Sequence, residues 1–473
     1  MSKVKRNFIY SVAYQMLLII APLVTVPYTS RVLGVDGIGT YAFTYAIVVY
    51  FTKIAMLGVN NHGSRSIAKN RHDKKALSRT FWSIYTIQAF MTILMIITYV
   101  AFTLLFMSKY QMLMLINGIY LVSTLLEANW FFYGLENVRI AVIRNSIVKI
   151  AAIALIFTFV KTPDDLLAYA AILSVSTVIG QITLLPSVLR KVNFVKIDFQ
   201  SIKPHIKSCL MLFIPIIAVS IYRIMDKIML GAMSSTVEVG YYEQADKIIT
   251  IPLGIITALG SIMIPRVSNL LSAGHHTKVM TNLHKMMDFS MFLALPMCLG
   301  LIAISHDFIL VFLGDAFMKS STLALLLAVT VVFNSFANAI RSSYLIPKER
   351  DKTFTASVIL GAVVNLAFNF ALIPLLQSVG AAIATIAAEF SVMFYQTMAV
   401  RHELPIRSYL KSATPFLAKA FIMFLVVYSL RIFNFPPLLS VLLQVSTGVT
   451  VYALLNWTYI DRLLDLRSRF KLR

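Results

Sequence analysis

The chain has 473 residues, of which 59% are hydrophobic and only 13% are charged. Soluble globular proteins are about 45–50% apolar and about 25% charged, so the composition excludes a water-soluble fold. The net charge of +22 would suit nucleic-acid binding in a soluble protein, whereas in a membrane protein it is typical of basic cytoplasmic loops.

Apolar runs long enough to cross a bilayer recur along the whole chain and predict an all-α membrane protein with fourteen transmembrane helices. The first run follows Lys3, Lys5 and Arg6 and has no small-residue cleavage site, so we interpret it as an uncleaved span. The connections are short, and no extramembrane domain is predicted. The predicted spans are 8–28, 38–60, 81–107, 112–134, 143–160, 166–189, 209–232, 238–264, 288–313, 320–346, 352–375, 378–400, 413–433 and 437–460.

The connections on the two sides of the predicted membrane differ strongly in charge. Those on the side of the chain ends carry 30 Lys and Arg residues, and the alternate connections carry 5. This asymmetry predicts that both termini are cytoplasmic. Because the basic residues are scattered over eight short segments, they also argue against nucleic acid as a partner.

A sequence repeat relates the first two predicted spans to the seventh and eighth. Residues 29–48 read TSRVLGVDGIGTYAFTYAIV, and residues 226–250 read DKIMLGAMSSTVEVGYYEQADKIIT. When Leu33-Gly34 is aligned with Leu230-Gly231, a Gly-Thr-Tyr triplet at 39–41 falls near a Gly-Tyr-Tyr triplet at 240–242. The offset is six helices, so both copies have the same orientation, as in transporters built from parallel repeats.

Sequence motifs of catalysis are absent. The chain contains neither the phosphate-binding G-x-x-x-x-G-K-[ST] pattern nor an H-E-x-x-H metal motif, and the eight histidines lie mostly in loops. Membrane glycosyltransferases and polymerases generally need a sizeable outer loop or domain, which this chain lacks. We therefore expect a protein that is not an enzyme and that has no cofactor and no metal site.

Charged residues inside the predicted spans are the main functional candidates, because each costs about 2.5–3.5 kcal/mol on insertion and is kept mainly for a function. The densest group lies on the seventh and eighth spans, at spacings of three and four that place each set on one helix face. Two interpretations stay open: a self-neutralising ion-pair network, or a site for a coupling ion. Arg223 is the deepest of the group and the one most favoured for substrate binding. The group comprises Arg223, Asp226, Lys227, Glu243, Asp246 and Lys247.

Three further charged residues are candidates in the first half of the chain. Lys53 has no acidic residue three or four positions away, so it either binds substrate or reaches back to the cytoplasmic surface. Glu127, close to Asn129 and Trp130, can bind a sugar, relay a proton or make an interhelical hydrogen bond. Arg31 ends the first span and faces headgroups or the mouth of a cavity. A basic cavity with Lys53 would suit a phosphate or diphosphate group.

The segment Ser30-Arg31-Val32-Leu33-Gly34, continued by Gly37-Ile38-Gly39-Thr40-Tyr41, resembles the R-x-L-G-x-x-G-x-G-x-Y signature of polysaccharide transporters. These are the Wzx-type oligosaccharide flippases of the multidrug/oligosaccharidyl-lipid/polysaccharide exporter superfamily. The segment from Asp226 to Tyr242 looks like their second-half counterpart. The resemblance implies two six-helix lobes, here residues 1–190 and 200–400. Two further helices at 413–460 and a basic cytoplasmic tail at 461–473 would follow.

The resemblance further implies a function in a bacterial cytoplasmic membrane. The protein would flip undecaprenyl-diphosphate-linked oligosaccharide repeat units from the inner to the outer leaflet by alternating access, for capsule, exopolysaccharide or O-antigen synthesis. Arg31, Lys53 and Arg223 would hold the diphosphate. The expected partners are the lipid-linked oligosaccharide, membrane lipids, a proton or sodium ion, and a polysaccharide polymerase. Two alternatives remain: a lipid II flippase, and a cation-coupled multidrug exporter that would use Asp226.

Overall fold

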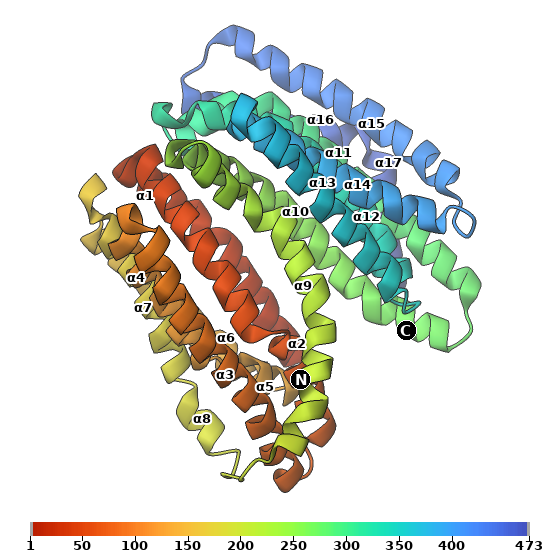
Figure 1. Cartoon of the computed structure of the whole chain (residues 1–473). Helices are drawn as coiled ribbons and strands as arrows, with labels where there is room; N and C mark the ends of the chain where they lie inside the picture. Colours follow the sequence, from red (N-terminus) through yellow and green to blue (C-terminus); the bar gives the residue numbers. More distant parts are fainter. Residues whose placement is uncertain (1–2, 471–473) are drawn as a thin grey trace. The chain divides into compact units, whose positions relative to one another are not determined.

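The computed structural model describes residues 3–470, and this part of the chain is helical over most of its length, with no β-strand (Figure 1). Thirteen of the helices in the described residues are long and apolar enough to cross a membrane. The first of them, Tyr14–Asn70, covers most of α1 (Lys3–Met56), which consists of two helices joined at a kink at Gly34. With the two parts of α1 counted separately, the number agrees with the predicted fourteen, and the predicted all-α membrane fold is confirmed.

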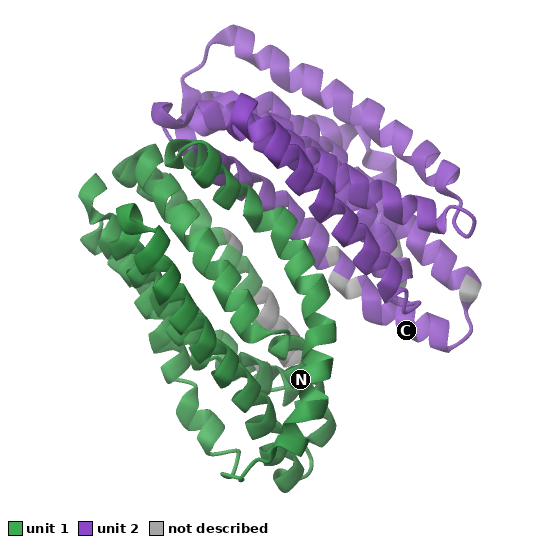
Figure 2. Ribbon diagram, viewed as in Figure 1, with its two compact units in different colours: residues 1–240 green, residues 241–473 purple. Residues whose placement is uncertain are grey.

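The chain divides into two compact units, which we call unit 1 (residues 1–240) and unit 2 (residues 241–473) (Figure 2). The units group helices by contact, whereas the lobes predicted at 1–190 and 200–400 group them by repeat, so the lobes stay a prediction. After α1, the helices that lie in unit 1 are α2 (Val59–Asn70), α3 (Lys74–Phe106), α4 (Gln111–Leu125), α5 (Asn129–Gly134), α6 (Val138–Phe159), α7 (Leu166–Ile182), α8 (Leu185–Leu189) and α9 (Phe199–Met233).

Unit 2 begins within α10, so that helix contributes its first five residues to unit 1 and the rest to unit 2. The remaining helices are α11 to α17, and a π-helical turn at Arg341–Leu345 follows α12. The helices are α10 (Thr236–Ser272), α11 (His276–Phe312), α12 (Lys319–Ile340), α13 (Asp351–Leu376), α14 (Ser378–Val400), α15 (Ile406–Ser429), α16 (Pro437–Leu455) and α17 (Trp457–Phe470).

The outward face of α3 carries a stripe of large apolar side chains. Phe90, Ile93, Ile97 and Leu104 are 67%, 50%, 62% and 53% exposed, and they recur at helical spacing. A continuous exposed apolar surface of this kind is unfavourable in water. The stripe therefore indicates a helix whose outer face contacts lipid.

The two copies of the repeated segment contact one another within unit 1. Gly34 has a φ of +68°, which turns the chain between the two parts of α1. Five residues later, Gly39 lies against the start of α10, where an added Cβ would be 1.7 Å from the Thr236 carbonyl oxygen. The Thr236 hydroxyl donates a hydrogen bond to Asp36 Oδ1 at 2.6 Å. The glycines of the signature thus serve both a turn and a close approach of two backbones.

In unit 2, a polar cluster joins the connection after α12 to the connection after α14. Glu403 accepts a hydrogen bond from the Tyr344 hydroxyl and pairs with the Arg350 guanidinium at 2.6 Å. Lys348 lies 3.6 Å from the same carboxylate and donates to the Tyr344 hydroxyl at 2.7 Å. The Tyr344 hydroxyl, followed by Arg350 and Lys348, holds the pKa of Glu403 below its ordinary value.

We expect Gly39→Ala to destabilise the protein by about 1–3 kcal/mol, because the added methyl group overlaps the backbone at Thr236. The matched control is Gly254→Ala in α10, whose added Cβ would meet no heavy atom within 4 Å. Alanine is the better helix former, so this control should be neutral or stabilising. Thermal unfolding in detergent compares the two, and equal stability of both variants would contradict the close approach.

Stability should depend on pH through Glu403. Its folded-state pKa is lowered, so its contribution is present above the unfolded-state pKa and is lost as the pH falls through the folded-state pKa. The melting temperature of wild type should therefore exceed that of Glu403→Gln at neutral pH, and the gap should close in acid. A gap that is unchanged between neutral and acidic pH would show that the charge of Glu403 has no role.

Candidate substrate-binding site

A polar pocket of ≈370 Å³ in unit 1 brings together two charged residues that the sequence singled out separately. Lys53 reaches it from the last turn of α1, and Glu127 reaches it from the connection between α4 and α5. Among the described residues, none forms a salt bridge with Lys53. The residues that line the pocket are Thr52, Lys53, Met56, Gly58, Asn60, Asn61, Thr124, Glu127 and Ile216.

The predicted span 112–134 implied a continuous helix around Glu127, but the structure has a break there. The helix stops at Leu125 and restarts at Asn129, and the Glu127 side chain closes the gap. Its Oε1 accepts a hydrogen bond from the Asn129 backbone N–H at 2.8 Å, and its Oε2 accepts one from the Gln181 amide. Hydrogen bonds to both oxygens fix the carboxylate in one orientation at the edge of the pocket.

The backbone at this gap is satisfied by a side chain from α3. The Gln88 amide donates to the carbonyl oxygens of Thr124 and Glu127 at 2.8 and 2.9 Å. The Trp130 indole N–H in turn donates to Gln88 Oε1 at 3.0 Å. Because unpaired carbonyl groups are costly inside a bilayer, these bonds allow a helix break at membrane depth.

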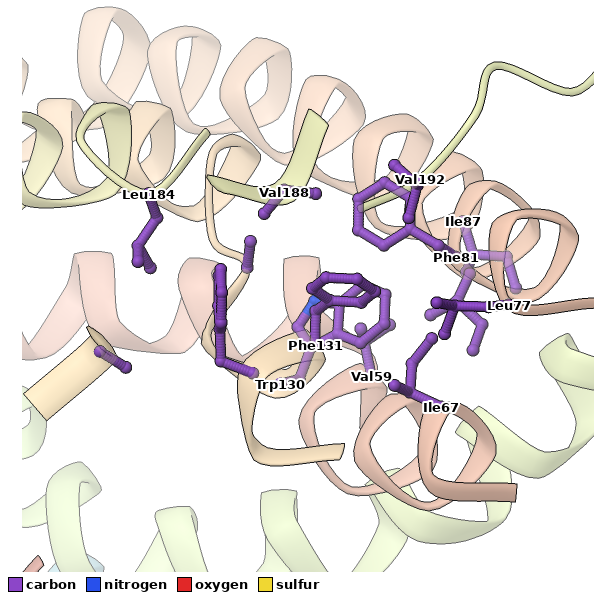
Figure 3. Close-up of a cluster of buried hydrophobic side chains, with 14 of the residues drawn as sticks. Val59, Ile67, Leu77, Phe81, Ile87, Trp130, Phe131, Leu184, Val188 and Val192 are labelled. Atoms are coloured by element: carbon purple, nitrogen blue, oxygen red, sulfur yellow. The ribbon is translucent and has the colours of Figure 1, made fainter. Parts of the chain in front are cut away.

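Trp130 is itself held in a fully buried apolar cluster (Figure 3). Its ring stacks on Phe81 of α3, with centroids 5.4 Å apart and planes 21° from parallel. Val59 and Ile67 contribute from α2, and Leu184 comes from the segment just before α8. The cluster therefore ties α2, α3 and α5 together beside the pocket.

Arg144 completes the polar surroundings of Glu127 and was missed by the sequence analysis. Its Nη2 donates to Asn129 Oδ1 at 2.8 Å, and its guanidinium interacts electrostatically with the Glu127 carboxylate. Arg144 lies at the start of the predicted span 143–160 and was counted with the basic residues of the preceding connection, whereas α6 begins at Val138 and places Arg144 well inside the helix. The apolar residues before Arg144 were the signal that the helix starts earlier.

The three predicted charges on α9 differ in their surroundings. Asp226 is 1% exposed and interacts electrostatically with Tyr50 of α1, whose hydroxyl donates to the Ser220 carbonyl oxygen at 2.8 Å. Arg223 is exposed, and Lys227 is half-buried. Each of the three takes part in a polar or electrostatic interaction, but none lines the pocket of Lys53 and Glu127.

The other candidates lie elsewhere. Arg31 is exposed on α1 and donates to the Pro27 carbonyl oxygen at 3.2 Å. On the part of α10 that belongs to unit 2, Glu243 and Lys247 form an ion pair at 3.1 Å, and Asp246 is half-buried. The predicted six-residue group is therefore distributed over two units, and its role stays a prediction.

An ammonium and a carboxylate kept in a polar pocket among membrane-spanning helices are typical of substrate and ion pathways in membrane transporters. The fold is shared by several solved structures, including the following two. One, titled "Lipid II flippase MurJ, inward closed conformation", has a TM-score of 0.79 and 16% identity, and the match covers 97% of this chain and 99% of that chain. The other is an inward-facing multidrug resistance MATE family transporter, with a TM-score of 0.64, 14% identity, and coverage of 85% and 99%.

Residues 4–271 match the family described as "Polysaccharide biosynthesis protein", and the chain belongs to this family. It is 23% identical to the "Putative O-antigen transporter" of Escherichia coli (strain K12), over 84% of this chain and 97% of that protein. These relatives confirm the resemblance to polysaccharide transporters and the prediction of a transporter, not an enzyme. The chain is a multi-pass membrane protein of the transporter and flippase type that belongs to a polysaccharide-biosynthesis family.

Replacement of Trp130 by Ala should destabilise unit 1 by about 3–5 kcal/mol, because it empties a buried site and removes the hydrogen bond to Gln88. Trp457→Ala is the control, since Trp457 is 63% exposed and its removal should change stability by less than about 0.5 kcal/mol. Thermal unfolding in detergent measures both. Similar melting temperatures for the two variants would contradict the role of Trp130.

Proposed function

We propose that the protein moves undecaprenyl-diphosphate-linked oligosaccharide repeat units from the inner to the outer leaflet by alternating access. The observation that supports this most is the meeting of Lys53 and Glu127 in one polar pocket among membrane-spanning helices. Charged groups are costly there and are kept mainly for a function. A lipid-linked sugar diphosphate offers phosphate anions to Lys53 and sugar hydroxyl donors to Glu127.

The pocket lining offers both hydrogen-bond donors and a carboxylate acceptor, and this combination suits a headgroup with phosphates and sugar hydroxyls. The Lys53 ammonium supplies three N–H donors for phosphate oxygens, and Asn60 and Asn61 supply amide donors and acceptors. Glu127, already oriented by Asn129 and Gln181, accepts hydrogen bonds from sugar hydroxyls. We propose that the diphosphate lies at Lys53 and the first sugar lies towards Glu127.

Orientation and energy supply are further parts of the proposal. The excess of basic residues on one side, 30 against 5, supports cytoplasmic termini, so the α1 end that carries Lys53 would face the cytoplasmic half of the membrane. A proton or sodium gradient would drive transport, and the buried Asp226 carboxylate is the coupling candidate. A polysaccharide polymerase would receive the flipped product.

Lys53→Gln should lower surface polysaccharide about 10- to 100-fold, because a hydrogen bond to a charged group contributes about 1.5–3 kcal/mol. The test complements a deletion strain with wild type, Lys53→Gln, Lys53→Arg or the exposed-site control Lys203→Gln. Lys53→Arg keeps the charge and should retain more function. Lipid-linked intermediates should accumulate on the cytoplasmic leaflet in the defective strain. Full polysaccharide from Lys53→Gln at equal protein level would refute the assignment.

The same strains separate the flippase from a cation-coupled drug exporter, which the burial of Asp226 keeps as a second candidate. Normal polysaccharide together with changed tolerance to cationic dyes, abolished by Asp226→Asn, would favour drug export. Accumulation of a peptidoglycan precursor in place of a polysaccharide intermediate would favour a lipid II flippase. Unaltered dye tolerance with lost polysaccharide would support the oligosaccharide flippase.

A further inference from the structure

A second polar pocket, of ≈480 Å³, lies in unit 2 between the ends of α10 and α11 that are joined by a short turn. Three cationic side chains and three neutral polar ones surround it, together with one leucine, and none of the lining residues is acidic. Both helices contribute, so the pocket is built by the hairpin and not by one helix end. The lining residues are Arg266, Asn269, Leu270, Lys278, Thr281, Asn282 and Lys285.

The pocket has an unusual charge environment for a protein that contains 20 acidic residues. No aspartate or glutamate occurs anywhere from residue 247 to residue 287. The next acid, Asp288, is engaged by the Ser412 hydroxyl at 2.7 Å and by His284 at 3.5 Å. The lining residues of the pocket therefore carry three positive charges and no negative one, and this lining suits an anion.

The position of the pocket along α10 and α11 indicates the depth at which the pocket lies in the membrane. Helices α10 and α11 have 37 residues each, or about 55 Å, which exceeds the roughly 30 Å hydrocarbon core. The apolar run of α10 ends at Ile264, two residues before Arg266, and that of α11 begins at Phe289, four residues after Lys285. The pocket thus begins where the apolar surface ends, at the depth of lipid headgroups.

We propose that this pocket binds the phosphate group of an anionic membrane phospholipid. A guanidinium and two ammonium groups supply charge-assisted hydrogen bonds to phosphate oxygens, and the two asparagine amides can bond to the glycerol and ester oxygens. Basic pockets between transmembrane helices at the cytoplasmic surface bind acidic lipid headgroups by the same chemistry. Free phosphate offers the same anion without the acyl chains. The site lies in a different unit from Lys53 and Glu127 and does not depend on the nature of the cargo.

The test measures lipid binding to the full-length protein in detergent by native mass spectrometry, with phosphatidylglycerol and zwitterionic phosphatidylcholine as probes. The variant Arg266→Gln/Lys278→Gln/Lys285→Gln should bind phosphatidylglycerol about tenfold more weakly than wild type, with phosphatidylcholine unaffected. The control variant Lys203→Gln/Lys207→Gln/Lys411→Gln removes the same charge from exposed sites and should bind as wild type does. Equal melting temperatures in phosphatidylcholine show that the variants fold.

A titration with inorganic phosphate distinguishes the two sources of the anion. Phosphatidylglycerol binding that is lost only in the pocket variant, and that millimolar phosphate does not reproduce, supports a phospholipid ligand. Stabilisation of wild type but not of the pocket variant by phosphate alone supports the same site with a free anion. Undiminished phosphatidylglycerol binding by the pocket variant, or equal loss in the control variant, overturns the proposal. None of these readouts requires transport, so failure of the proposed function is distinguishable from failure of this site.

Discussion

Bilayer hydrocarbon offers no hydrogen bonds, and this constraint governs where the chain of unit 1 is able to depart from a regular helix. The break between α4 and α5 exists because Gln88 binds the carbonyl oxygens that the helix leaves open, and Trp130 holds Gln88 in place. A non-helical segment at membrane depth needs partners of this kind. The polar residues around the break thus allow the helix to stop there. Because it stops, Glu127 lies beside the pocket in a connection and not on the surface of a helix.

The same constraint applies to charge. Glu127 is retained at the break with both carboxylate oxygens hydrogen-bonded and with Arg144 nearby, so its polar atoms have partners within the protein. Lys53 has no such arrangement among the described residues, although it lines the same pocket. Under the proposed function this asymmetry would suit a transporter that must release its cargo, because Glu127 would orient the sugar and the bound diphosphate would compensate the charge of Lys53.

The apolar runs alone predicted the helical membrane fold and nearly all of its spans, because a spanning helix is marked by length and composition. The repeat was also visible in the sequence. The first two predicted spans, however, are not separated by a loop: they form the single helix α1, which is kinked at Gly34. The pocket was not predictable, since Lys53 and Glu127 lie far apart in the chain and meet only through packing. The break at 126–128 escaped notice because it contains no Gly or Pro. Arg144 was counted with the connection before its span because the predicted helix start, residue 143, is five residues later than the observed one.

The crossing of the two repeat copies has a consequence for how the sequence is able to vary. An added methyl group at Gly39 would overlap the backbone of Thr236, and one at Gly240 would lie 2.2 Å from the Val35 carbonyl oxygen. Each copy thus occupies the space into which the other would have to grow. The two copies, about two hundred residues apart in the chain, therefore constrain one another at this point. Swapping either copy for that of a distant relative should succeed only when its counterpart is exchanged as well.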